Sequence, residues 1–105
     1  MIFELRTYTV AHGQMTSYLD RYEHQALPLL RKHLGRFLGF YVSEIGPLNQ
    51  VLHIWAYEDL TDRQHRRAEL DADPAWHAFK ELNAGTFVHQ EVKIMRDLPF
   101  SPQWL

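Results

Sequence analysis

The sequence predicts an α+β fold, and two observations lead to this prediction. Four stretches in which apolar and polar residues alternate are each typical of a β-strand. Helical stretches separate the first strand from the second and the third from the fourth. The order is therefore βαββαβ. Right-handed crossovers fold this order into a ferredoxin-like, four-stranded antiparallel sheet with the helices on one face.

The first strand and the first helix are predicted in the N-terminal third. Residues 2–10 alternate and are rich in β-branched and aromatic side chains, as expected for a strand. Residues 14–33 repeat apolar side chains at steps of three and four, which predicts a helix that ends near Gly35. Pro28 lies inside this helix, lacks an amide hydrogen and clashes with the carbonyl group of His24, so we expect a kink or break there.

The other three strands are predicted from the same alternation. Residues 36–45 and 50–58 form two strands, and the Gly-Pro-Leu-Asn segment at 46–49 forms the hairpin turn between them. Residues 86–95 form the last strand. The expected spatial order of the strands is 4-1-3-2, which places the first and third strands at the centre of the sheet.

The second helical stretch is predicted to contain two consecutive helices. Thr61 opens it, with Gln64 as its capping-box partner. Asp73 then caps a second helix, in which Pro74 occupies the first helical position. Gly85 closes this second helix. The stretch also contains three arginines, which we expect on a solvated helix face: Arg63, Arg66 and Arg67.

Length and composition limit the function classes. A chain of 105 residues predicts a single domain over 1–105, with 99–105 as an extended C-terminal tail. The absence of cysteine excludes disulfides, iron–sulfur clusters, thiolate zinc sites and a cysteine nucleophile. A formal net charge of −2 argues against nucleic acid as a partner. We expect no membrane contact and a cytoplasmic location, because no signal peptide and no apolar run of about 18 residues is present.

The alternation also predicts which side chains share a face of the sheet. We expect the helices to cover the more aliphatic face, which contains Phe3, Leu5, Leu38, Phe40, Val42, Leu52, Ile54, Ala56, Val88, Val92 and Ile94. The other face then contains Glu4, Arg6, Tyr8, Phe37, Tyr41, His53, Trp55, Tyr57, Phe87, His89, Glu91 and Met95. It is too aromatic to stay in water and too polar for an ordinary core. A second copy packed on it would solve both problems, so we expect a homodimer with its sheets face to face.

Five sequence segments resemble the NIPSNAP family over essentially the whole chain. They are Glu4-Leu5-Arg6-Thr7-Tyr8, the hairpin run from Glu44 to Val51, His53-x-Trp55-x-Tyr57, Asp73-Pro74-x-Trp76 and Leu98-Pro99-Phe100-Ser101-Pro102. The resemblance implies a dimeric α+β barrel, which agrees with the dimer expected from the alternation. Related barrels include cofactor-independent monooxygenases and haem-degrading enzymes, so the resemblance indicates the fold strongly and the reaction weakly.

Three ring side chains form the central candidate site. His53, Trp55 and Tyr57 project from one face of a central strand, where they could line a pocket for a hydrophobic or aromatic molecule. His53 would act as a general base and Arg6 would steady a developing oxyanion. The predicted ligand-binding set is completed by Tyr8, Tyr41 and His33.

Each candidate residue also has a structural interpretation. The rings could serve only as dimer anchors, Arg6 could form a buried ion pair with Glu4 or Glu91, and His33 could interact with the helix dipole. The leading hypothesis is a small-molecule binding protein, and its catalytic form is an oxygenase-like or isomerase-like enzyme that needs no cofactor. The alternative is a non-catalytic interaction module in which the same face only builds the dimer.

No metal or cofactor is expected from the sequence. His53, His89 and Glu91 suggest a His-His-carboxylate site, but the first strand separates the strands that carry them. Two strand spacings amount to roughly 9.5 Å, which is long for shared ligation. No glycine-rich phosphate loop or dinucleotide fingerprint is present.

Overall fold

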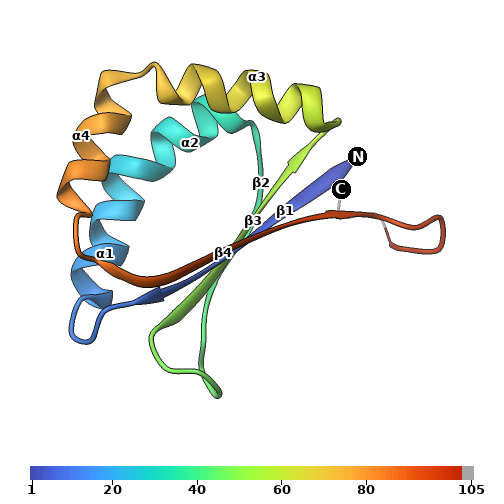
Figure 1. Ribbon diagram of the computed structural model, residues 1–105. Coiled ribbons are helices and arrows are strands. Elements are labelled where there is room, and N and C mark those ends of the chain that lie inside the picture. The colour runs from blue at the N-terminus through green and yellow to red at the C-terminus, as the bar shows by residue number, and fades with distance from the viewer. Residues whose placement is uncertain (103–105) are drawn as a thin grey trace.

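The computed structural model describes residues 1–102 and confirms the βαββαβ plan (Figure 1). The strands form one antiparallel sheet in the order β2-β3-β1-β4, as expected. All the helices of the described chain lie on one side of this sheet (Figure 1). In chain order the elements are β1 (Ile2–Val10), α1 (Met15–Arg21), the π-helical segment η1 (Tyr22–Ala26), α2 (Leu27–Leu34), β2 (Arg36–Val42), β3 (Gln50–Tyr57), α3 (Leu60–Asp71), α4 (Pro74–Leu82) and β4 (Phe87–Arg96).

The helices cover the polar and aromatic face of the sheet, so the predicted assignment of the two faces is wrong. Arg6 is paired with His53 across β1 and β3, and Tyr22 from η1 packs its ring 5.6 Å from the His53 ring. Glu4, Tyr8, His53, Trp55 and Tyr57 are all buried in this single chain. This face does not need a second copy to leave water, because the chain's own helices supply both its apolar cover and partners for its charges.

An irregularity in β2 explains part of the wrong assignment. The register between β2 and β3 shifts between Phe37 and Gly39, so that Phe37 is paired with Trp55 and Phe40 with His53. Both rings therefore lie on the helix-covered face, and the side-chain alternation is reversed beyond the bulge. Tyr41 is paired with Leu52 on the opposite face and is 52% exposed.

The edge strand β4 also differs from the expected alternation. Val92 is paired with Arg6, whereas Glu91 is paired with Thr7 and His89 with Thr9 on the uncovered face. A register shift between Thr9 and Val10 returns Phe87 to the helix-covered face, where its ring lies 4.9 Å from that of Tyr8. His89 and Glu91 therefore project away from His53.

The first helix contains a π-helical segment directly before Pro28. The amide of Leu27 donates to the carbonyl of Tyr22, five residues back, and the helix bends between α1 and α2 (Figure 1). The predicted irregularity near Pro28 is present as this wider turn. Buried residues occur at every fourth position: Tyr18, Tyr22, Ala26, Leu30 and Leu34. In a regular α-helix, every fourth residue lies about 40° further around the helix axis. The π-helical turn contains more residues per turn and compensates for this rotation, so the five buried residues all face the sheet.

The caps of α3 and α4 are formed by aspartates. The side chain of Asp59 accepts from the amide of Asp62, so α3 begins at Leu60 and the predicted Thr61 cap is wrong. Asp73 caps α4 through the amide of Ala75, with Pro74 in the first turn, as expected. An acceptor at this position satisfies an amide that has no partner inside the helix.

The C-terminal segment turns rather than running fully extended. The amide of Ser101 donates to the carbonyl of Leu98, 2.9 Å away, which closes a turn after β4. Residues 103–105 of the predicted tail lie outside the described residues. Among the helices of residues 1–102, none is both long and apolar enough to cross a membrane.

Candidate functional site

A cavity of about 230 Å³ lies between the helices and the sheet. Its walls are mainly aromatic and aliphatic, and several cationic or amide groups are set into them. Exposed Lys80 and Gln90 mark its mouth. The lining residues are Arg6, Tyr8, Tyr18, Tyr22, Leu30, Leu34, His53, Trp55, Arg67, Trp76, Phe79, Lys80, Asn83, Phe87 and Gln90. A concave, largely apolar space with a few polar groups is typical of a small-molecule site.

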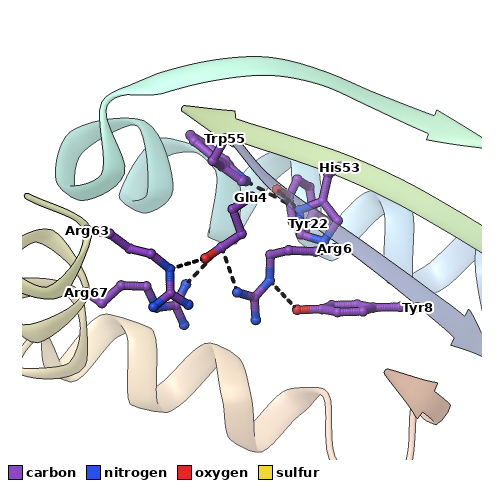
Figure 2. Close-up of polar contacts among 8 residues, drawn as sticks. All are labelled: Glu4, Arg6, Tyr8, Tyr22, His53, Trp55, Arg63 and Arg67. Atoms are coloured by element: carbon purple, nitrogen blue, oxygen red, sulfur yellow. Dashed lines mark hydrogen bonds and ion pairs between the residues drawn. The ribbon is translucent and has the colours of Figure 1, made fainter. Parts of the chain in front are cut away.

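Glu4 is buried and is surrounded by three arginines, of which Arg6 and Arg67 line the cavity (Figure 2). Arg6 Nη1 donates to Glu4 Oε1 at 2.8 Å, and Arg63 Nε from α3 donates to Oε2. Arg67 Nη1 lies 4.0 Å from Oε1. Burial acts to raise the pKa of Glu4, but the charges and hydrogen bonds of Arg6 and Arg63 outweigh it and lower the pKa below its usual value.

Arg6 is held in place from two sides. Its Nη1 is bound to Glu4, and its Nε donates to the hydroxyl of Tyr8 at 2.7 Å (Figure 2). All three residues project from the same face of β1, because they are two residues apart. Nη2 of Arg6 forms no hydrogen bond within residues 1–102. Since Arg6 lines the cavity, the N–H groups of this nitrogen are free to bind a ligand.

His53 is buried in the cavity wall with one ring nitrogen paired and the other free. The indole N–H of Trp55 donates to Nδ1 at 3.4 Å, and the hydroxyl of Tyr22 lies 3.4 Å from the same atom. An indole nitrogen can only donate, so Nδ1 is an acceptor and the proton of the neutral ring lies on Nε2. Nε2 has no hydrogen-bond partner within the described chain. Burial, assisted by the charge of Arg6, lowers the pKa of His53 to about 3.

Comparison with known proteins agrees with the fold and identifies the family. The family model named NIPSNAP matches residues 3–102. The chain belongs to the NIPSNAP family. A NipSnap homolog 2 protein from Danio rerio is 33% identical over 96% of this NIPSNAP chain, and one from Homo sapiens is 31% identical over the same share. This chain spans about a third of the length of these curated relatives, 35% in both cases.

Solved structures of bacterial NIPSNAP proteins are similar over most of their length. A NIPSNAP family protein with unknown function from Agrobacterium tumefaciens shares 41% identity at a TM-score of 0.92 and covers 97% of this chain and 92% of its own. A putative antibiotic biosynthesis monooxygenase from Nitrosomonas europaea reaches a TM-score of 0.68 at 12% identity, and it covers 93% of this chain and 99% of its own. That likeness shows a shared fold only.

The structure brings some of the predicted site residues of this NIPSNAP chain together and separates others. Four of them line the cavity: Arg6, Tyr8, His53 and Trp55. Tyr57 is buried on the same sheet face but outside the cavity lining. Burial raises the pKa of Tyr57 to about 12, so its hydroxyl stays protonated. Tyr41 lies on the opposite face of the sheet because of the β2 bulge.

His33 connects two helices instead of lining the cavity. Its Nε2 lies 2.9 Å from Oδ2 of Asp73, the residue that caps α4. This contact joins the end of α2 to the start of α4. The hydrogen bond from His33 and the amide of Ala75 together lower the pKa of Asp73. His33 therefore lies where it supports the helix layer above the cavity.

Sequence reasoning missed the helical half of the NIPSNAP cavity. Arg63 and Arg67 were expected in solvent, yet both face Glu4. Their spacing of four residues on one helix stripe, together with an acidic residue on a buried strand, was a signal that could have found them. Six of the other missed lining residues belong to the apolar stripes of the helices: Tyr18, Tyr22, Leu30, Leu34, Trp76 and Phe79. The remaining four are Lys80, Asn83, Phe87 and Gln90.

Residues that could hold a metal do not cluster in this part of the chain. Within residues 1–102, no group of three or more His, Cys, Asp or Glu side chains is placed to bind an ion. His89 and Glu91 lie on the uncovered face of the sheet, across from His53. The charged groups that line the cavity, Arg6, Arg67 and Lys80, are cationic hydrogen-bond donors, so the arrangement is suited to an oxygen-bearing organic ligand.

Proposed function

We propose that this NIPSNAP chain binds a small hydrophobic or aromatic molecule in the cavity between its helices and its sheet. The observation that carries the proposal is the free Nε2 of His53, a buried donor on a residue that lines a mainly aromatic and aliphatic cavity. A buried polar group without a partner costs about 1–3 kcal/mol. A ligand oxygen that accepts from Nε2 would recover this cost, and the surrounding rings would bury the ligand's apolar part.

We assign His53 the role of a hydrogen-bond donor in this function, in place of the general base suggested by the sequence. A base at Nε2 needs its proton on Nδ1, where that proton would face the indole N–H of Trp55. Two donors facing each other in a buried site are unfavourable. His53 and Arg6 are cross-strand neighbours and both line the cavity, and we propose that both donate to one ligand oxygen. Such a pair would stabilise the enolate or phenolate oxygen of an oxygenase-like or isomerase-like reaction that uses no cofactor.

The non-catalytic alternative has to be reformulated in view of the fold. It assumed that the aromatic face only builds a dimer, but the chain's own helices cover that face. A non-catalytic version now means a protein that binds the same ligand in the cavity without converting it. Turnover of a bound ligand, measured in oxygenated buffer without added metal or cofactor, distinguishes the two versions.

Ligand titration followed by NMR tests the binding. The probe is 1-naphthol, which combines a flat apolar body with one oxygen. We expect saturable shifts of backbone amides at Trp76, Phe79 and Phe87. His53→Phe keeps the ring that packs beside Phe40 but removes the donor, and should weaken binding about five- to tenfold, since one neutral hydrogen bond contributes about 1 kcal/mol.

A matched control is His65→Phe, which changes an exposed histidine of α3 outside the cavity and should leave the affinity unchanged. If the amides near the cavity do not shift at any soluble concentration of 1-naphthol, the proposed binding function is wrong. If 1-naphthol binds equally well to His53→Phe, the donor role of His53 is wrong.

We further propose that two copies associate through the uncovered face of the sheet. Leu5, Leu52, Ile54 and Tyr41 share this face, and no helix of residues 1–102 covers it. Glu91 and Lys93 add charges of both signs at β4. A second copy presents the same apolar centre, and a two-fold arrangement can place unlike charges opposite each other.

Sedimentation at micromolar concentration tests this association. Leu52→Lys places a charge at the centre of the uncovered face and should convert a dimer to a monomer without unfolding the chain. Leu48→Lys is the matched control, because Leu48 is 82% exposed in the β2–β3 hairpin. A wild-type protein that sediments as a monomer would overturn the proposed association.

A further inference from the structure

We propose that the ligand of the cavity is an anion: a flat aromatic or similarly apolar molecule with one carboxylate, which Arg67 and Arg6 bind. This inference rests on the proposed binding function and narrows it to a chemical class.

The first argument is the charge balance around Glu4. Three arginines surround this single carboxylate. Arginine stays protonated in proteins, so three positive charges against one negative charge leave an excess of two. Arg63 and Arg6 already occupy both oxygens of Glu4 with hydrogen bonds. The surplus charge therefore belongs mainly to Arg67 and to the free end of Arg6.

The second argument is the position of Arg67. Its Nη1 lies 4.0 Å from Glu4, which is beyond hydrogen-bond distance, and within residues 1–102 its guanidinium makes no hydrogen bond. Only 23% of the side chain is exposed. A partly buried guanidinium without a bonded partner is a costly arrangement. Since Arg67 lines the cavity, a ligand carboxylate can supply the missing partner through a two-bond contact.

The third argument is the composition of the cavity wall. Arg6, Arg67 and Lys80 are cationic, and no aspartate or glutamate is among the lining residues of the described chain. The free N–H of His53 is a further donor on a lining residue. An anion would therefore meet several donors and no negative charge in the lining, whereas a cation would be repelled.

The fourth argument concerns the shape and size of the ligand. The volume of about 230 Å³ exceeds the roughly 150 Å³ of a cavity that binds benzene. One or two fused rings with a small substituent therefore fit. Trp76 and Phe79 offer ring faces on the helix side, stacked on each other at 5.4 Å, and Phe87 offers a ring on the sheet side. This arrangement favours a flat apolar body over a bare inorganic anion.

Calorimetry with a matched pair of probes tests the inference. The probes are 1-naphthoate and 1-naphthamide, which have nearly the same shape and differ in charge. We expect the wild-type protein at pH 7 to bind the carboxylate at least tenfold more tightly than the amide. Arg67→Gln should abolish this preference. Arg66→Gln should retain it, because Arg66 lies on the same helix but pairs with Asp62 outside the cavity.

The carboxylate-to-amide ratio is measured within each variant, so a general loss of stability does not imitate the expected result. Equal binding of both probes to the wild-type protein would overturn the anion inference and leave the proposed binding function intact. Retention of the preference in Arg67→Gln would overturn the role of Arg67. Failure of both probes and of 1-naphthol to bind would overturn the binding function itself.

Discussion

The indole N–H of Trp55 donates to Nδ1 of His53, two residues before it on the same face of β3. Both side chains are buried, and the register of β3 with β1 places them opposite Glu4 and Arg6. The contact keeps the acceptor nitrogen of His53 turned toward Trp55 and leaves the N–H of Nε2 free. A single strand therefore supplies the ring and fixes its tautomer.

The tautomer of His53 is directly measurable. Long-range ¹H–¹⁵N correlation spectra should show His53 as the Nε2–H tautomer, neutral throughout the range from pH 5 to 8, because burial lowers its pKa to about 3. Trp55→Phe removes the donor to Nδ1 and should increase the fraction of the Nδ1–H tautomer. A predominantly Nδ1–H ring in the wild-type protein would contradict the assigned donor role.

The pH dependence of stability should reveal the same burial. Unfolded His53 binds a proton below about pH 6.5, whereas the folded residue stays neutral to about pH 3. The unfolded state thus binds more protons in this window, and the free energy of unfolding falls as the pH drops. The slope from this one group approaches about 1.4 kcal/mol per pH unit.

Urea unfolding of the wild-type protein and His53→Phe between pH 6.5 and 5 isolates this effect. The other titrating groups are the same in both proteins, and the lowered pKa of Glu4 acts only below its unfolded value near 4.5. The wild-type protein should lose stability more steeply with acidification than the variant. Parallel pH profiles would show that His53 is not held neutral by the fold.

We expect the stability of the fold to be sensitive to substitution of Glu4, because three arginines surround its carboxylate. Glu4→Gln leaves Arg6, Arg63 and Arg67 with an uncompensated positive charge and should lower the free energy of unfolding by about 3–5 kcal/mol. Glu58→Gln is the control, because Glu58 is 69% exposed and forms a 3.8 Å surface pair with Arg36. This control should change stability by about 1 kcal/mol or less. Equal effects of the two substitutions in chemical denaturation would contradict the structural role of Glu4.

Substitution of Trp55 distinguishes the observed position of this residue in the core from the dimer interface expected from the sequence. An indole at a dimer interface would tolerate Trp55→Lys by dissociating into folded monomers. The structure instead places Trp55 in the core, 4.7 Å from the Phe37 ring and near the arginine cluster. A buried, unpaired lysine there should unfold the chain, with loss of circular dichroism rather than only a change in sedimentation. A folded monomer of this variant would support the earlier interface interpretation.

Local sequence patterns were sufficient for the elements and their order. The alternation in residues 2–10 predicted β1, and the Asp73-Pro74 pair predicted the start of α4, because these signals depend only on near neighbours. The strand order followed from the connection rules that apply to any βαββαβ chain. The residues of β3 in the candidate site, His53 and Trp55, were identified for the same reason.

The tertiary structure decided which face of the sheet the helices cover and what the site contains. A one-residue bulge between Phe37 and Gly39 moved Phe40 onto the covered face and Tyr41 off it, and an alternation pattern does not reveal such a shift. Glu4 could be buried because α3, almost sixty residues away in sequence, brings Arg63 to it. Partners at that separation meet only when the helices pack on the sheet, so the cavity and its surplus of positive charge are properties of the folded chain.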